Sequence, residues 1–196
     1  DYTLTYLNNV NAGVATIRIS GTGTHYTGEK DITFAILRRS INHATFGEIA
    51  NQVYTGKDIE PVVTVTENGV TLVENKDYTL MYKNNVKTGV ATVTVAGKGN
   101  YTSTKTIPFA IRPCNVTNPT VTGKSSTTVS LSWKSTGVVT GYEIYRMGPD
   151  GKWQLVGGTK QTTYTDAKLS ANTSYAYKIR SYVVEGDETY YGEFST

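Results

Sequence analysis

The stretch DYTLMYKNNVKTGVATVTVAGKGNYTSTKTIPFAI, residues 77–111, determines how the sequence divides, because it occurs nearly intact a second time. The other copy is DYTLTYLNNVNAGVATIRISGTGTHYTGEKDITFAI, residues 1–36. The copies are offset by 76 residues (77 − 1) at their start and by 75 (101 − 26) from Tyr26 and Tyr101 onward, so the first copy carries one extra loop residue. A period of this size is typical of one small domain per repeat, since solenoid repeats are shorter.

Each copy predicts three consecutive antiparallel strands. In the second copy, apolar residues recur at alternate positions over residues 78–82, 89–96 and 107–111, which is the period of half-buried strands. Asn84-Asn85 lies between the first two strands and predicts a turn, because asparagine adopts positive φ more readily than most residues. Pro108 has no N–H to donate, so we expect the third strand at a sheet edge or locally bulged.

The second copy is preceded by a further half-module, residues 41–76, that the first copy lacks. This half contains candidate strands at residues 49–54 and 63–65, and Asn68-Gly69 gives a strong hairpin-turn signal before Leu72. Together with the three strands of the repeat, it predicts a module of about six short strands, as in a small β-sandwich.

Residues 1–38 therefore form a partial module. Because the sequence opens on a strand-like Asp1-Tyr2, we interpret the chain as a fragment of a longer polypeptide. The apolar face and the strand edge of the partial module would be uncovered. We predict that they pack on the neighbouring complete module or pair with another molecule, self-pairing included.

The composition favours strands and turns, since the 196 residues include 15 Tyr and 19 Gly, with 38% hydrophobic and 18% charged residues. We therefore expect an all-β protein. The net charge of +3, without a concentrated basic cluster, gives no basis for nucleic-acid binding. No apolar run approaches the ~20 residues of a membrane span, so we expect no membrane insertion.

A different strand pattern begins after the linker at residues 113–119, which contains two prolines. Apolar residues alternate over 129–133, at Tyr142 and Ile144, and again over 177–183. This region predicts a second kind of β-sandwich.

The repeat resembles the immunoglobulin-like repeats of surface and secreted proteins of Gram-positive bacteria, especially clostridia and their gut relatives. The resemblance rests on YTGKDIEP (residues 54–61), DYTLMYKNN (77–85) and GVATVTVAGKGNYT (89–102). It implies adhesion and spacing rather than catalysis. Ser103, where the first copy has Gly28, is a minor departure from the pattern.

The C-terminal region resembles a fibronectin type III domain, on Trp133 as the buried tryptophan of the second strand and on Leu169 to Tyr175 as the tyrosine corner. The integrin motif Arg-Gly-Asp is absent from the loop at residues 184–188. The two resemblances imply tandem immunoglobulin-like and fibronectin type III β-sandwiches. We place a partial immunoglobulin-like repeat at residues 1–38, a complete one at 39–113 and the fibronectin type III domain at 114–196.

The residues needed for catalysis or metal binding are sparse. His25 and His43 fall in different modules, and Cys114, the only cysteine, lies beside a linker proline with no histidine near it in the sequence. The acidic loop at 185–188 is interpreted as a solvated loop tip rather than a calcium site, which takes six to eight oxygen ligands. We therefore predict no catalytic, cofactor-binding or metal-binding residues and no enzyme activity.

Three aromatic residues are least explained by core alternation: Trp153, Tyr190 and Tyr191. They are candidate ligand-contact residues, because aromatic faces can stack on sugars. Packing within the sandwich is the alternative interpretation.

The predicted function is that of a non-catalytic spacer or stalk in a cell-surface or secreted protein of a Gram-positive bacterium, with a contribution to adhesion. The alternative is a carbohydrate-binding accessory region of a secreted polysaccharide-degrading enzyme. Candidate partners are a host glycan, a matrix protein or a cell-wall polysaccharide. The expected location is extracellular or in the cell wall.

Overall fold

The computed structural model describes residues 1–135 and 137–195. Within this part of the chain the elements are strands, apart from one short 3₁₀ helix, so the predicted all-β fold class is confirmed. By its internal contacts the chain divides into two compact units. The first unit holds residues 1–48, 62–82 and 93–107, and the second holds residues 49–61, 83–92 and 108–196. The domain limits expected from the sequence stay predictions.

The first unit contains short strands and the 3₁₀ helix: β1 (Tyr2–Leu7), β2 (Gly13–Gly21), β3 (Glu29–Ile36), β4 (Arg39–Ser40), η1 (Ile41–His43), β5 (Thr45–Phe46), β7 (Val65–Glu67), β8 (Val70–Thr71) and β11 (Tyr101–Thr102). Three longer strands have residues in both units: β9 (Tyr78–Lys83), β10 (Gly89–Gly97) and β12 (Thr104–Arg112).

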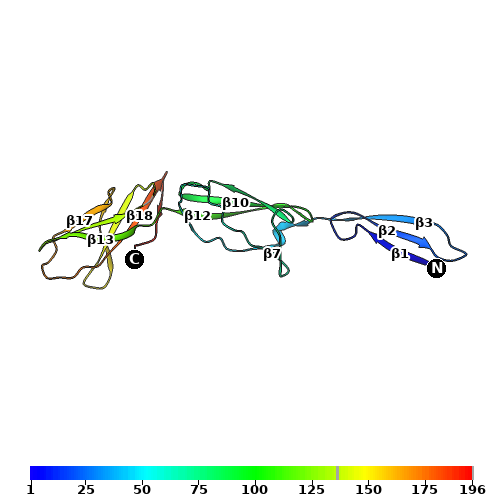
Figure 1. Ribbon diagram of the computed structural model, residues 1–196, viewed down its shortest axis with the longest axis horizontal. Coiled ribbons are helices and arrows are strands. Elements are labelled where there is room, and N and C mark those ends of the chain that lie inside the picture. The colour runs from blue at the N-terminus through cyan, green and yellow to red at the C-terminus, as the bar shows by residue number, and fades with distance from the viewer. Residues whose placement is uncertain (136, 196) are drawn as a thin grey trace. The chain divides into compact units, whose positions relative to one another are not determined.

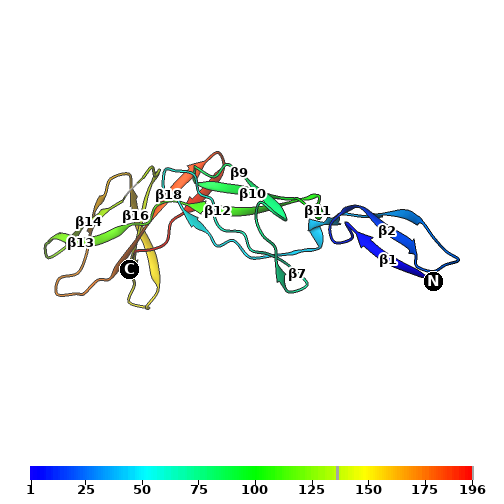
Figure 2. The same cartoon turned by 45° about the vertical axis from the view of Figure 1, so that its right-hand side comes forward.

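The first copy of the repeat forms the three-stranded antiparallel sheet β1-β2-β3, as predicted. The three strands lie side by side as one layer, which both views of the chain show (Figure 1, Figure 2). Asn8 follows β1 with φ 56°, and Asn84 follows β9 with the same φ, so both asparagine pairs open turns as expected. The repeat therefore folds locally as its sequence predicts.

The apolar side of this sheet is exposed. Tyr2 is 66% exposed, Tyr6 52% and Ile32 49%. Packing of these side chains on the neighbouring module stays a prediction. Pairing with another molecule stays a prediction.

The Asn-Gly signal is confirmed in the sheet β5-β7-β8. Asn68 (φ 48°) and Gly69 (φ 78°) both adopt positive φ between the antiparallel strands β7 and β8, as a type I′ hairpin requires.

Pro108 is expected in an edge strand or at a bulge, and the structure places it in an inner strand at a position that β6 does not pair with. Strand β12 lies between β6 (Gln52–Val53) and β10, so it is not an edge strand of the sheet β6-β12-β10-β9. However, β6 pairs only with Ile111 and Arg112. Pro108 lies outside that paired stretch, where its missing N–H leaves no bond to β6 unmade.

The second unit contains β6 and a β-sandwich made of β13 (Thr117–Lys124), β14 (Thr128–Lys134), β15 (Gly141–Met147), β16 (Trp153–Thr159), β17 (Thr163–Ala167), β18 (Tyr177–Glu185) and β19 (Glu188–Tyr191). Its two sheets have the strand orders β13-β14-β17 and β16-β15-β18-β19.

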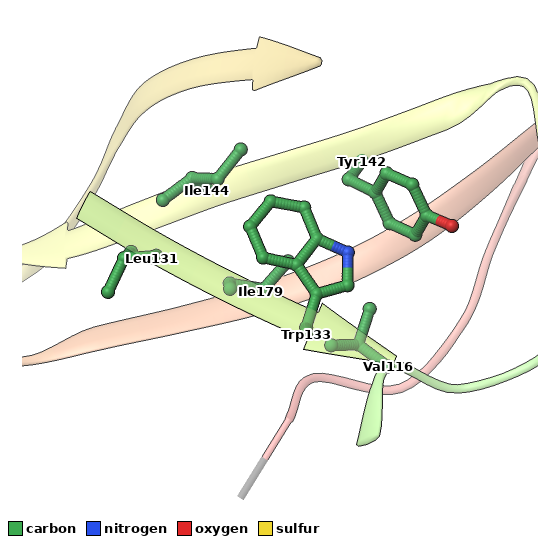
Figure 3. Close-up of a cluster of buried hydrophobic side chains, with 6 residues drawn as sticks. All are labelled: Val116, Leu131, Trp133, Tyr142, Ile144 and Ile179. Carbon is green, nitrogen blue, oxygen red and sulfur yellow. The ribbon is translucent and has the colours of Figure 1, made fainter. Parts of the chain in front are cut away.

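The core of this sandwich forms around Trp133. The indole packs edge-on against Tyr142, with ring centroids 5.3 Å apart and an interplanar angle of 71°. Val116, Leu131, Ile144 and Ile179 complete the cluster, and each is at most 4% exposed (Figure 3). The alternation predicted for β14, β15 and β18 therefore identifies the buried residues correctly.

The tyrosine corner is also confirmed. The backbone N–H of Ser170 donates to the Tyr175 hydroxyl oxygen at 2.9 Å. This bond ties the turn at residues 168–174 to the start of β18.

Candidate ligand-contact face

The register of the four-stranded sheet gives it one buried and one outer side. Ile144 pairs with Ile179, and both point into the core. Because side chains alternate along a strand, the neighbouring pairs Tyr145↔Lys178 and Glu143↔Arg180 face outward. The outer side of this sheet, on β16-β15-β18-β19, is the place where sequence-predicted aromatics and charged groups meet.

Two cations lie against aromatic rings on this side. Lys178 Nζ is 4.8 Å from the ring centroid of Trp153 and 3.8 Å from that of Phe194. Arg180 Cζ is 3.8 Å from the ring centroid of Tyr191 and 5.0 Å from that of Phe194. We use the name outer ladder for these residues together with Tyr145: Tyr145, Trp153, Lys178, Arg180, Tyr191 and Phe194. Each such cation–π contact contributes about 0.5–1 kcal/mol where solvent is near.

Glu143 holds one end of the outer ladder in place. Arg180 donates to Glu143 Oε2 through Nε at 2.9 Å and to the Tyr145 hydroxyl oxygen through Nη2 at 3.2 Å, and its Nη2 forms an ion pair with Glu143 Oε2 at 2.8 Å. The Tyr145 hydroxyl donates to the same oxygen at 3.1 Å. Burial, reinforced by this bond to Glu143, raises the pKa of Tyr145. Both effects favour the protonated phenol, which is the form that donates the bond to the carboxylate.

Phe194 closes the outer ladder from the C-terminal segment. Its ring packs edge-on against Tyr145, with centroids 5.2 Å apart and an interplanar angle of 87°. The ring planes are therefore crossed rather than coplanar, and cations cover ring faces. This is not the flat, bare aromatic strip that free stacking on a sugar would favour.

The three sequence-predicted contact residues do not share one face. Trp153 and Tyr191 belong to the outer ladder and are 37% and 36% exposed. Tyr190 pairs with Val183, a core position, so it points to the other side of the sheet and is half-buried. The structure thus places two of the three residues on the outer ladder, whereas Tyr190 points to the other side of the sheet.

Sequence reasoning missed Lys178, Arg180, Glu143 and Phe194. A signal for the first two was present, because Lys178 and Arg180 alternate with Tyr177 and Ile179 on a predicted strand. Phe194 lies beyond β19, where no alternation applied.

A surface hollow of about 390 Å³ adjoins the outer ladder. Its lining includes Arg112, Arg180 and Glu193, together with both Tyr190 and Tyr191. Arg112 pairs with Glu193 across it. The hollow offers guanidinium and hydroxyl groups beside ring edges, which can hydrogen-bond a polar, hydroxyl-rich ligand.

A second polar cluster lies inside the sandwich. Arg146 Nη1 donates to Asp166 Oδ2 at 2.7 Å, and the Tyr177 hydroxyl donates to the same oxygen at 2.9 Å. Burial and the Asp166 carboxylate raise the pKa of Tyr177 well above its usual range. The three groups satisfy one another, and they link β15, β17 and β18.

The candidate catalytic and metal-binding residues do not form a common site. His25 and His43 are exposed, and Cys114 is buried with its Sγ 3.3 Å from Ser135 Oγ. Across residues 1–135 and 137–195, no three His, Cys, Asp or Glu side chains are grouped to hold a metal ion. No helix in the described part of the chain has the length and apolar character needed to cross a membrane.

Residues 115–195 match the family model described as the fibronectin type III domain. Among curated proteins, an alpha-amylase of Niallia circulans is 36% identical over 89 residues, which are 44% of this chain and 6% of the amylase. Exoglucanase B of Cellulomonas fimi is 30% identical over 127 residues, which are 61% of this chain and 11% of the exoglucanase. A poly(3-hydroxybutyrate) depolymerase of Ralstonia pickettii is 41% identical over 59 residues, which are 30% of this chain and 11% of the depolymerase. The chain therefore spans about a tenth or less of the length of these relatives.

Two solved structures are similar at low sequence identity. A set of titin domains is 14% identical with a TM-score of 0.35, and the match covers 100% of this chain and 81% of that one. The chicken CNTN1 FN1–FN3 domains are 16% identical with a TM-score of 0.33, over 93% of this chain and 72% of theirs.

Proposed function

We propose that this chain is a non-catalytic spacer within an extracellular bacterial enzyme that acts on a carbohydrate polymer. The matches to an alpha-amylase and an exoglucanase support a place within a larger enzyme. In both relatives the matched segment is a small part of a much longer chain. The Gram-positive origin and the cell-wall location implied by the repeat motifs belong to the same proposal.

The observation that carries the spacer function is the shortness of the connections between modules. Only Leu37 and Arg38 separate β3 from β4, and residues 113–116 separate β12 from β13. Short connections restrict bending between neighbouring modules, and Pro113 stiffens the second connection further, which is what a spacer requires.

Spin labels at two exposed positions test this directly. Val62 is 89% exposed in the first unit and Val138 is 75% exposed in the second. Cysteines at these sites carry nitroxides in a Cys114→Ser background, where the serine hydroxyl can keep the contact to Ser135. A narrow distance distribution by double electron–electron resonance is expected. A broad distribution, like that of modules on flexible tethers, would contradict the spacer function.

A second candidate function is contact with the polysaccharide through the outer ladder, in an accessory or adhesive role. The exposure of Trp153 and Tyr191 on one side of the sheet favours it. The adjoining hollow adds hydrogen-bond donors. Host glycans, matrix proteins and cell-wall polysaccharides are the candidate partners in this case.

Retention on insoluble starch and cellulose separates the two candidates. Saturable retention that is lost in the Trp153→Ala, Tyr191→Ala variant would support polysaccharide contact. The matched control is Tyr26→Ala, which removes an aromatic ring that is 69% exposed in the first unit. No retention of the unaltered chain would favour the spacer function alone.

A further inference from the structure

The sheet β1-β2-β3 carries a continuous apolar row on one side. The register pairs Leu4 with Ile19, Tyr6 with Ile17, and Ile17 in turn with Ile32, which places these side chains on the same side. We define the open face as Tyr2, Leu4, Tyr6, Ile17, Ile32 and Phe34. Leu4 is 45% exposed and Phe34 39%, in addition to the exposed Tyr2, Tyr6 and Ile32.

The opposite side of the sheet carries polar and charged side chains. Arg18 Nε donates to Asp31 Oδ1 at 2.9 Å, and Nη2 donates to Oδ2 at 2.9 Å. Thr16 and Thr33 pair on the same side. The two sides therefore differ as the inner and outer faces of a sandwich sheet do, although the inner one is uncovered.

The second copy of the repeat shows the same residues in a covered state. Tyr78, the equivalent of Tyr2, is 5% exposed, and Phe109, the equivalent of Phe34, is 4% exposed. Val93, which stands where the first copy has Ile17, is 0% exposed. Two similar sequences thus differ in burial because of what lies against them.

The covering residues of the second copy come from the half-module at residues 41–76. Ile41 and Val65 are 0% exposed and Val63 is 3% exposed, in the same unit as Tyr78 and Val93. The Tyr78 hydroxyl donates to the Val63 carbonyl oxygen at 3.3 Å. Among residues 1–135 and 137–195, none covers the open face in this way, since Tyr2, Tyr6 and Ile32 remain about half exposed or more.

We propose that the open face is a docking site for a polypeptide layer of the kind that residues 41–76 form, supplied by another half-module of this type. The fit is specific, because Tyr2, Leu4, Tyr6, Ile32 and Phe34 are the same residue types as their counterparts in the covered copy. The Tyr2 hydroxyl takes the role of Tyr78 and donates to a main-chain carbonyl of the docked layer. Alternating Ile, Val and Leu side chains from that layer fill the space over Ile17 and Phe34.

The test extends the full chain with a second copy of residues 39–76 placed directly before Asp1. The new junction, Lys76 to Asp1, then repeats the natural junction of Lys76 and Asp77. Hydrogen exchange measured by mass spectrometry should show at least tenfold slower exchange over residues 1–36 than in the unextended chain. Exchange over the fibronectin type III domain should not change.

The matched control carries the same extension with its added Val63 and Val65 positions changed to Ser, so that length and charge are kept while the apolar row is lost. Protection by the natural extension and not by the control is the expected result. Equal protection by both, or protection by neither, would overturn the proposal. So would a concentration-dependent dimer of the unextended chain that protects residues 1–36 equally well, since a second open face would then be the occupant.

Discussion

Tyr78 and Tyr2 occupy the same position in the two copies of the repeat, and truncating each should reveal how much stability the covering layer confers. Tyr78 is 5% exposed and its hydroxyl is bonded to Val63, whereas Tyr2 is 66% exposed. Replacing a large buried aromatic residue by alanine costs about 3–5 kcal/mol, because both the transfer free energy and the cavity contribute.

The expected cost at Tyr2 is much smaller. About a third of the residue is buried (100% − 66%), and no closed cavity is left when the ring is removed. Scaling the burial free energy of a large apolar side chain, about 1.5–3 kcal/mol, by that fraction gives about 0.5–1 kcal/mol. Tyr78→Phe should cost on the order of 1 kcal/mol or less, since it removes only the hydrogen bond.

Native-state hydrogen exchange can measure both variants in the same chain. Tyr78→Ala should speed the exchange of β10 amides by about a hundredfold to several thousandfold, since each 1.4 kcal/mol is a factor of ten. Tyr2→Ala should speed that of β2 amides by only about twofold to fivefold. Equal effects in β10 and β2 would refute the argument that residues 41–76 stabilise the second copy by covering its apolar side.

Further predictions concern the fibronectin type III domain, with urea unfolding of this domain as the measurement. Tyr175→Phe should lower its free energy of unfolding by about 1 kcal/mol, because the N–H of Ser170 loses its acceptor; an unchanged midpoint would contradict this. Asp166→Ala should lower the free energy of unfolding by about 2–3 kcal/mol, because Arg146 and Tyr177 both lose their partner. This value lies between those for exposed and for buried ion pairs, since the Arg146 side chain is 26% exposed. The free energy of unfolding should also fall as the pH rises above about 10, the ordinary pKa of tyrosine, because the raised pKa of Tyr177 keeps it protonated in the folded state only. Tyr177→Phe should flatten this pH dependence, and an equal slope in both proteins would show that other tyrosines cause it.

The strand pattern and much of the core could be predicted from the sequence, because both depend on local periodicity. Leu131, Trp133 and Ile144 are buried as their alternation predicts. Asn68-Gly69 forms its hairpin because only a few residue types accept positive φ at both positions. These features need no knowledge of the partner strand.

The candidate site could be predicted only in part. The sequence indicates that Trp153 and Tyr191 are aromatics unexplained by core alternation, but their side of the sheet depends on strand order and register. Tyr190 and Tyr191 are adjacent in sequence, so they point to opposite faces, and a list of aromatics cannot separate them. Lys178 and Arg180 reach rings from other strands, and such contacts depend on tertiary structure that periodicity does not encode.

The two ends of the outer ladder are not equally open to a ligand, and this bears on the choice between spacer and polysaccharide contact. Arg180 is fixed over Tyr191 by an ion pair and an N–H bond to Glu143 and by a second N–H bond to Tyr145, so a sugar ring would have to displace a charged, hydrogen-bonded group to reach that face. Lys178 is held against Trp153 by a cation–π contact on a flexible stem, and displacing it costs only about 0.5–1 kcal/mol. Stacking of a sugar is therefore feasible at the Trp153 end and opposed at the Tyr191 end. A single stacking position without a second coplanar ring favours weak contact at most. The same ladder fixes the C-terminal segment at Phe194 to the sheet, which agrees with the proposed spacer function.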